Sequence, residues 1–200
     1  MKRAALILSQ PFTRFLGNDF IVCADAGYKR AQSIGLRTDL VVGDMDSLGY
    51  SPQEVATVVV QKEKDFSDGE LGVRQIALRN YTDLDIYGAV GGRLDHTLYN
   101  LHLLELSKDL GISAVIRGDD YDVYYTEGNL LIGADIGDII SIVPFSDTVH
   151  IMKTKGLKYP ADGLVFTKRD TLGLSNECAE KGGVFISVRE GSALIIHYFR

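Results

Sequence analysis

The chain has 200 residues and a formal net charge of -6, which is enough for one large domain or two small ones. Its apolar fraction of 46% and charged fraction of 24% are ordinary for a globular protein, so a long disordered segment is not expected. The acidic balance argues against a general nucleic-acid binder, which carries a basic surface. It does not exclude a nucleotide ligand, because a bound cation reverses the local charge.

The lack of a recognisable targeting signal and the spacing of the cysteines predict a cytoplasmic protein. No stretch approaches the roughly 18 apolar residues of a membrane-spanning helix, so no membrane partner is expected. The apolar run at the start, residues 4–8, is too short for a signal peptide. Cys23 and Cys178 lie far apart in the sequence without the spacing of a metal site, which predicts buried, reduced thiols.

The first part of the chain alternates strand-like and helix-like segments, the pattern of a parallel α/β sheet. Ser67 is expected to cap a helix, with Glu70 as its capping-box partner. Apolar residues at 94, 98, 101, 104 and 106 predict a helix with one buried face. The expected strands are 4–8, 20–24, 40–42, 58–60, 84–87 and 112–116, and the expected helices are 27–34, 68–79 and 94–110.

From about residue 121, short runs of β-branched and aromatic residues alternate with turn residues. This pattern is typical of an all-β sandwich or roll. The expected strands are 121–126, 130–132, 138–143, 148–152, 163–167, 183–188 and 193–198. We place the boundary near residues 117–120, which predicts one domain over 1–118 and a second over 119–200.

Acidic residues follow successive strands of the first domain. Ligands of open parallel sheets bind beyond the carboxyl ends of the strands, so these side chains are expected to meet at one edge. Carboxylates repel one another unless a cation lies between them, and Mg²⁺ is held by a few carboxylates together with substrate phosphates. A single aspartate after a strand is more often a cap or turn residue, but several in successive loops predict a magnesium–nucleotide enzyme. The residues are Asp25, Asp44, Asp46, Asp65 and Asp68.

A glycine-rich turn over residues 88–92 precedes the helix that begins at 94. Glycines let backbone N–H groups approach an anion at a helix N-terminus, and Arg93 could contact a phosphate. Tight strand-to-helix turns also use glycines routinely, and neither a P-loop nor a GxGxxG pattern is present. Asp95 could equally be a helix N-cap, and His96 an ordinary surface or core histidine.

Two loops of the second domain, 156–160 and 173–177, have unusual sequences for turns. As ordinary turns they would have no functional role. If they reach a site, Tyr159 can stack on an aromatic ring. Ser175 and Asn176 can then form hydrogen bonds with ring nitrogens or amines.

These motifs, taken together, resemble those of the thiamine pyrophosphokinase (thiamin diphosphokinase) family over nearly the whole chain. Each motif alone has modest specificity, but six in the family's order are highly specific. They are Asp25-Ala26-Gly27, Gly43-Asp44-Met45-Asp46-Ser47, Lys64-Asp65-Phe66-Ser67-Asp68, Gly91-Gly92-Arg93-Leu94-Asp95-His96 with Asn100, Gly156-Leu157-Lys158-Tyr159-Pro160, and Ser175-Asn176-Glu177.

The resemblance implies an enzyme that transfers a pyrophosphoryl group from ATP to the hydroxyl of thiamine, giving thiamine diphosphate and AMP. It implies an N-terminal Rossmann-like α/β domain with a parallel sheet and a C-terminal β-sandwich. It also implies a homodimer whose site lies between the α/β domain of one subunit and the β domain of the other.

Residue by residue, the resemblance implies that Asp44, Asp46 and Asp68 hold Mg²⁺, with Asp65 nearby. Either Asp68 or Asp95 would accept or orient the hydroxyl proton, and the sequence leaves this choice open. Arg93, with Lys64, would offset charge on the phosphate oxygens. The implied nucleotide and phosphate residues are Asp25, Gly27, Lys64, Ser67, Gly91, Gly92, Asp95 and His96, and the implied thiamine-ring residues are Tyr159, Ser175 and Asn176. Gly69, inside the first turn of an expected helix, has no functional explanation from the sequence.

Three alternatives remain at this stage. A pyrophosphokinase for another alcohol would share the acidic loops but need a different ring pocket. A non-catalytic sensor of a magnesium–nucleotide or of thiamine diphosphate would keep the binding loops without turnover. A structural protein would use the same aspartates only as caps.

Overall fold

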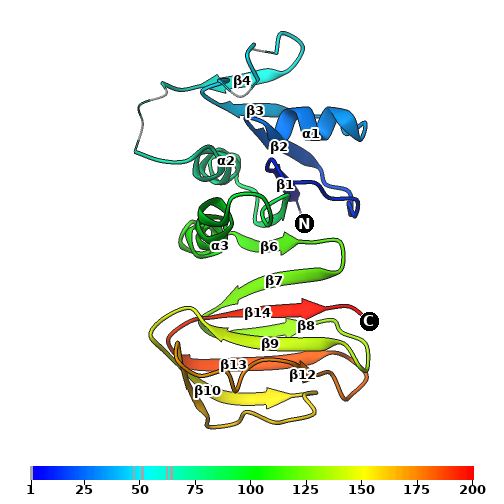
Figure 1. The fold of residues 1–200 in the computed structure, drawn as a ribbon, viewed down its shortest axis with the longest axis vertical. Helices are drawn as coiled ribbons and strands as arrows, with labels where there is room; N and C mark the ends of the chain where they lie inside the picture. Colours follow the sequence, from blue (N-terminus) through cyan, green and yellow to red (C-terminus); the bar gives the residue numbers. More distant parts are fainter. Residues whose placement is uncertain (1, 47, 51, 62, 64) are drawn as a thin grey trace. The chain divides into compact units, whose positions relative to one another are not determined.

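The computed structural model describes residues 2–46, 48–50, 52–61, 63 and 65–200. Ser47 and Lys64 of the sequence motifs therefore lie outside the described residues. The chain has a mixed α/β fold made of two compact units, Met1–Asp119 and Asp120–Arg200 (Figure 1).

The first unit is built on a parallel sheet of apolar strands in the order β6-β5-β1-β2-β3-β4. Continuous apolar runs favour such strands because helices cover both faces of a parallel sheet. The predicted elements are found, with ends that differ by no more than two residues. They are β1 (Arg3–Ile7), β2 (Phe20–Ala24), α1 (Gly27–Ser33), β3 (Leu40–Gly43), β4 (Ala56–Val59), α2 (Asp68–Ala77), β5 (Asp83–Tyr87), α3 (Leu94–Asp109) and β6 (Ser113–Arg117).

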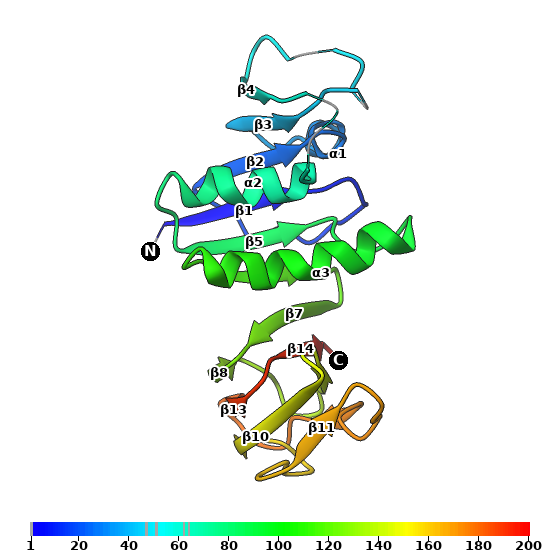
Figure 2. The same cartoon turned by 90° about the vertical axis from the view of Figure 1, so that its left-hand side faces the viewer.

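The helices cover the two faces of this sheet unequally. Figures 1 and 2 show α1 on one face and both α2 and α3 on the other. Two glycines let α2 lie close to its neighbours. A Cβ on Gly69 would be 3.1 Å from Cδ1 of Leu103 in α3, and a Cβ on Gly72 would be 2.5 Å from Cδ1 of Leu6 in β1. Close helix packing therefore explains Gly69, for which the sequence offered no reason.

The predicted buried face of α3 is wrong for the first half of the helix. Leu94 and Leu98 are 71% and 52% exposed, whereas Leu103 and Leu104 are buried. The apolar period was read correctly as a helix, but only its second half packs on the rest of the first unit. The first half presents an apolar surface to solvent in the single chain.

The second unit contains two sets of hydrogen-bonded antiparallel strands, in the orders β12-β9-β14-β7 and β11-β10-β13-β8. Buried side chains from both sheets form one apolar cluster that includes Ile142 of β9 and Ile186 of β13. Strand β10 runs three residues further than predicted, and the short β12 was not predicted. The strands are β7 (Tyr121–Thr126), β8 (Asn129–Ile132), β9 (Ile139–Pro144), β10 (Thr148–Lys155), β11 (Val165–Thr167), β12 (Asn176–Glu177), β13 (Val184–Glu190) and β14 (Ala193–Tyr198).

Two further expectations concern the cysteines and the membrane. Cys23 and Cys178 are buried and free, as predicted, and burial raises the pKa of the Cys23 thiol to about 12. Within the described part of the chain, no helix has both the length and the apolar character needed to cross a membrane.

Candidate active site

The strand order of the first unit reverses at β1. The chain runs outward from β1 through β2, β3 and β4, and then adds β5 and β6 on the other side of β1. Such a reversal leaves a crevice beyond the carboxyl ends of the strands, where ligands of open α/β sheets bind. Ser9 follows β1, Asp25 follows β2 and Gly88 follows β5, so all three stand at this edge.

Three aspartates converge beside this crevice. Asp25 follows β2, Asp44 follows the neighbouring parallel strand β3, and Asp68 begins α2. One carboxylate oxygen from each lies within 4.8 Å of the other two, so the three could hold one metal ion. Asp25 is buried, whereas Asp44 and Asp68 are half-buried and remain accessible.

The backbone around Gly43 makes this convergence possible. Gly43 has φ +140°, and a Cβ there would lie 3.1 Å from Cβ of Asp25 and 3.2 Å from Cγ of Asp68. Asp25 and Met45 also adopt positive φ, at +42° and +64°. Left-handed backbone at non-glycine residues is strained and concentrates at functional sites. A side chain at position 43 would fill the space between two of the carboxylates.

The Asp25 carboxylate fits a cation ligand. Its Oδ1 is buried and has no hydrogen-bond partner among the described residues. A buried carboxylate oxygen without a donor is costly, and a hard divalent cation such as Mg²⁺ satisfies such an oxygen. The partnerless atom and the two neighbouring carboxylates together form a donor set of the kind that Mg²⁺ takes.

Asp46 and Asp65, which the resemblance also placed at the metal, are both exposed. The backbone N–H of Asp46 donates a hydrogen bond to Oδ1 of Asp44, at 3.0 Å. Neither residue belongs to the group of three carboxylates within 4.8 Å, and Asp25 takes that place. Their part in metal binding remains a prediction.

A cavity of about 320 Å³ opens next to two of the three carboxylates. Its walls combine loop residues after β1 and β2 with the first turns of α2 and α3. The lining residues are Leu8, Ser9, Ala24, Asp25, Ala26, Ser67, Asp68, Gly69, His96 and Asn100. Gly27 adjoins it at the start of α1, where a Cβ would lie 2.1 Å from the carbonyl oxygen of Ile7, so this glycine lets α1 pack on β1.

Ser67 is the N-cap of α2, as predicted from the sequence. Its Oγ accepts a hydrogen bond from the backbone N–H of Glu70, at 3.1 Å. The Glu70 carboxylate pairs with Arg74 instead of completing the capping box. The Ser67 hydroxyl lines the cavity and keeps its own proton for donation, because a hydroxyl can accept and donate at the same time.

The glycine turn, Gly88–Gly92, does not itself line the cavity, but it joins β5 to α3 beside it. The N-cap of α3 is Arg93, so Asp95 is not the N-cap. The Arg93 guanidinium donates through Nε to one carboxylate oxygen of Asp95, at 3.1 Å, and through Nη2 to the other. This pairing lowers the pKa of Asp95 to about 2, although both side chains are exposed.

The second unit contains its own cavity, of about 360 Å³. Its walls are mainly apolar, and the three residues predicted to reach a ring ligand all take part. The lining residues are Ile142, Tyr159, Pro160, Ala161, Leu164, Phe166, Leu172, Gly173, Leu174, Ser175 and Asn176.

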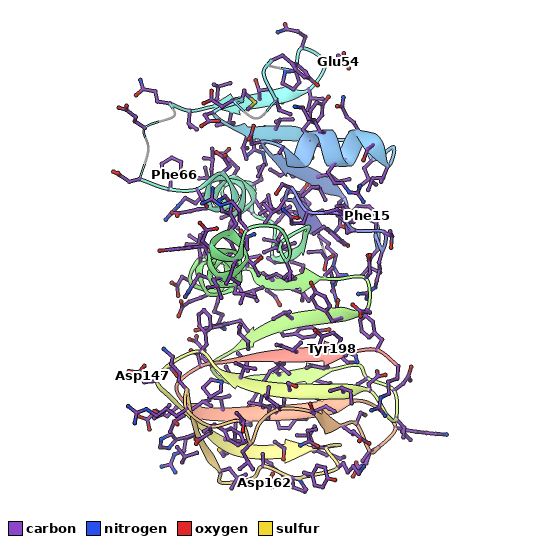
Figure 3. All side chains as sticks on the ribbon, in the orientation of Figure 1. Phe15, Glu54, Phe66, Asp147, Asp162 and Tyr198 are labelled. Atoms are coloured by element: carbon purple, nitrogen blue, oxygen red, sulfur yellow. The ribbon has the colours of Figure 1, made fainter. Side chains whose placement is uncertain are left out.

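Hydrogen bonds hold the two loops of this cavity together. Oδ1 of Asn176 accepts from the backbone N–H of Tyr159, at 3.1 Å, and Nδ2 of Asn176 donates to the carbonyl of Tyr159, at 2.7 Å. Asp162, labelled in Figure 3, accepts from both N–H and Oγ1 of Thr154 and ties the same loop to β10. Tyr159 remains 62% exposed, so its side chain is available to a ligand.

Comparison with known proteins identifies two family models that match successive parts of the chain. The family model described as "Thiamin pyrophosphokinase, catalytic domain" matches residues 14–116, and "Thiamin pyrophosphokinase, vitamin B1 binding domain" matches residues 131–192. The thiamine pyrophosphokinase of Bacillus subtilis (strain 168) is 30% identical over 162 residues, which cover 77% of this chain and 75% of that protein. The chain belongs to the thiamin pyrophosphokinase family. The predicted family, enzyme class and function as a thiamine pyrophosphokinase are confirmed.

Solved structures of thiamin pyrophosphokinases share this fold. The crystal structure of the Bacillus subtilis protein has a TM-score of 0.85, with 22% identity and 99% coverage of both chains. The structure of the Geobacillus thermodenitrificans protein has a TM-score of 0.84 and 22% identity, and the match covers 99% of this chain and 98% of that chain. At this identity the likeness extends to the fold alone.

The match to the thiamin pyrophosphokinase catalytic domain covers all three clustered carboxylates, and the match to the vitamin B1 binding domain covers the second cavity. Sequence reasoning missed Ser9 and gave Asp25 a place near the nucleotide, not at a metal. The same strand-end argument that selected Asp25 would have found Ser9, because it follows β1 in the same way. No local signal in the sequence could have shown that the carboxylates of Asp25 and Asp68 meet, because the two residues are far apart along the chain.

Proposed function

We propose that this protein transfers the pyrophosphoryl group of ATP to the hydroxyl of thiamine, giving thiamine diphosphate and AMP. One observation carries the proposal: three carboxylates, one with a buried partnerless oxygen, lie beside a cavity in the region that matches the family's catalytic domain. A purely structural role as helix caps does not explain this arrangement, because Oδ1 of Asp25 caps nothing within the described residues.

Magnesium is the cation that suits this site. Asp25, Asp44 and Asp68 would hold it, and Asp46 and Asp65 complete the set that the resemblance implies. When bound, Mg²⁺ supplies neutralisation of charge on the phosphate oxygens. The protein's remaining task is to position the two substrates, because phosphoryl transfer requires little covalent participation from the enzyme.

The phosphates of ATP would lie between the start of α2 and the start of α3. The Ser67 hydroxyl can donate to a phosphate oxygen while it caps α2. The N-terminus of α2 carries a partial positive charge that favours an anion. Arg93 keeps Nη1 for a phosphate while Nε and Nη2 bind Asp95, and Gly91, Gly92, His96 and Lys64 stay in the proposed nucleotide set, with Lys64 outside the described residues.

The structure favours Asp68 over Asp95 as the group that orients the thiamine hydroxyl. Asp68 lines the cavity, whereas Asp95 does not. The pKa of Asp95, lowered to about 2 by Arg93, makes its carboxylate a poor proton acceptor. We assign Asp95 the task of holding the Arg93 guanidinium in place.

The thiamine ring would bind in the cavity of the second unit. Its apolar walls suit an aromatic ring, and the exposed Tyr159 ring can stack on it. Both Asn176 amide groups already bind the backbone of Tyr159, so this side chain acts mainly by fixing the Tyr159 loop. Ser175 retains its hydroxyl for the ligand.

The two units are assigned as a Rossmann-like domain that binds ATP and Mg²⁺ and a β-sandwich that binds thiamine. We assign a cytoplasmic homodimer with the site between subunits, as the resemblance implies. The first half of α3 exposes three large apolar side chains, Leu94, Leu98 and Tyr99. Their exposure to water is unfavourable, which supports a second subunit that covers them. Sedimentation of the intact protein tests the dimer, and a monomer at micromolar concentration would contradict it.

The reaction is tested by measuring AMP release from ATP and Mg²⁺ with and without thiamine, while thiamine diphosphate is followed by fluorescence after oxidation. Equal amounts of AMP and thiamine diphosphate are expected. Formation of ADP would mean that a single phosphoryl group is transferred. AMP release without dependence on thiamine would point to another alcohol as the acceptor.

A further inference from the structure

Carbonyl groups of the glycine turn, residues 88–92, are held in part by the surrounding protein. Three of them accept hydrogen bonds: Gly88 O from the backbone N–H of Gln10 at 3.1 Å, Ala89 O from Nδ2 of Asn100 at 2.8 Å, and Gly91 O from Oγ1 of Thr97 at 3.1 Å. A carbonyl oxygen repels an anion. A turn with engaged carbonyls is therefore suited to an anionic ligand.

The N–H groups at the end of the turn differ from the carbonyls. Within the described residues, the backbone N–H groups of Gly92 and Arg93 have no hydrogen-bond partner. Backbone N–H groups at the start of a helix are the usual donors to a phosphate. The glycine turn thus combines engaged acceptors with available donors next to the cavity lined by His96 and Asn100.

The Thr97 side chain binds both backbone polar groups of Gly91. Its Oγ1 accepts from the backbone N–H of Gly91, at 3.1 Å, and also donates to the carbonyl of Gly91, at 3.1 Å. Gly91 and Gly92 adopt φ +119° and +63°, and glycine samples many such conformations unless it is held. A hydroxyl can both accept and donate through one atom, as Thr97 does here.

The Gln10 side chain lies against the same turn. A Cβ on Gly92 would lie 2.6 Å from Nε2 and 2.8 Å from Oε1 of Gln10. Gln10 therefore leaves no room for a side chain at position 92, although Gly91 and Gly92 are themselves exposed. Thr97 supplies the contact from α3 that fixes the conformation of Gly91.

We propose that Thr97 is a positioning residue for nucleotide binding: its hydroxyl fixes Gly91, and thereby keeps the donor groups of the glycine turn available to a phosphate of ATP. This inference rests on the proposed function, because it takes ATP as the ligand. Thr97 does not line the cavity, so its effect passes through the conformation of the turn.

The experiment compares Thr97→Val, which keeps the shape but removes the hydroxyl, with Thr97→Ser, which keeps the hydroxyl. Loss of these hydrogen bonds is expected to raise KM for ATP roughly three- to tenfold, with kcat and KM for thiamine changed by less than about twofold. Titration calorimetry of ATP with Mg²⁺, in the absence of thiamine, should show the same weakening. Thr97→Ser should restore affinity close to that of the unmodified protein.

Thr82→Val is the matched control. Thr82 is exposed at the opposite end of the sheet and donates one hydrogen bond to Asp83, so its loss should leave both KM values unchanged. Circular dichroism checks that each variant is folded, and Thr97→Ala replaces Thr97→Val if the latter does not fold.

Two results would overturn the inference: unchanged ATP affinity in Thr97→Val, or equal weakening in Thr97→Ser and Thr97→Val. Failure of the proposed function gives a different result. The unmodified protein would then bind ATP and Mg²⁺ but form no thiamine diphosphate, and the calorimetric comparison would still decide the role of Thr97.

Discussion

The cavity beside the carboxylates and the cavity of the second unit differ in how their polar groups are satisfied. In the first unit, a buried oxygen of Asp25 has no partner within the described residues, and two more carboxylates lie close to it. In the second unit, both ends of the Asn176 amide bind the backbone of Tyr159, and Ser141 accepts from the backbone N–H of Ser175. Among the residues described, the first cavity leaves a buried carboxylate oxygen without a donor, whereas the second has a self-supporting frame around an apolar space.

The largest expected effect comes from removing charge in the first cavity. Asp25→Asn or Asp44→Asn should lower turnover roughly a hundredfold or more, because charge stabilisation by a bound metal contributes several kcal/mol. We expect the same for Asp46→Asn, which belongs to the proposed metal set. Thiamine-dependent AMP release is measured over a range of Mg²⁺ concentrations. The control is Asp147→Asn, an exposed residue of the second unit, and normal turnover of Asp44→Asn at saturating Mg²⁺ would refute the metal site.

Crowding the carboxylates should give the next largest effect. Gly43→Ala places a Cβ between Asp25 and Asp68 and requires φ +140° of a non-glycine residue. Displaced carboxylates are expected to lower kcat/KM roughly ten- to a hundredfold, and the strain to lower stability by about 1–3 kcal/mol. Gly111→Ala separates the two effects, since Gly111 has φ +76° but no atom within 4 Å of its Cβ position. If both variants lose activity equally, crowding at the site is not the cause.

Removing an aromatic ring from the second cavity should act on one substrate only. Tyr159→Ala is expected to raise KM for thiamine roughly tenfold, the size of a lost stacking contact, with less change for ATP. Tyr159→Phe keeps the ring and should remain near the parent value. Steady-state kinetics with each substrate varied in turn makes the comparison, and equal shifts in both KM values would count against stacking.

The smallest expected effect concerns the pH dependence of stability. Burial favours a raised pKa for Asp138, but hydrogen bonds from His197 and from the backbone N–H groups of Asp135 and Arg200 lower it below its usual 3.8. Because the folded-state pKa is the lower one, the stabilisation is complete well above pH 3.8 and is lost as pH falls below it.

Asp138→Asn should therefore flatten the fall in stability on the acid side, with lower stability at neutral pH. Urea unfolding between about pH 2.5 and 7 measures this. Glu180→Gln, at an exposed position, is the control, and an unchanged acid slope in Asp138→Asn would contradict the assignment.

Local chemistry explains which parts of the fold the sequence predicted. The Ser67 cap was predictable because an N-cap depends on a hydroxyl and an N–H group three residues apart. The strands of the first unit were predictable from apolar runs that end at turn residues. The prediction that α3 buries its apolar face was wrong at Leu94 and Leu98. A helical period reveals an apolar stripe, but it does not reveal which part of the protein covers that stripe.

The sequence by itself determined the family, since ordered short motifs survive in the linear chain, and it selected the candidate site residues. Only the tertiary structure decided which of those residues meet. Asp25 joins Asp44 and Asp68 because β2 and β3 are parallel neighbours and Gly43 leaves room between the side chains. Asp46, only two residues from Asp44, is exposed and lies outside that group, so the pairing of strands and not distance along the sequence decides which carboxylates meet.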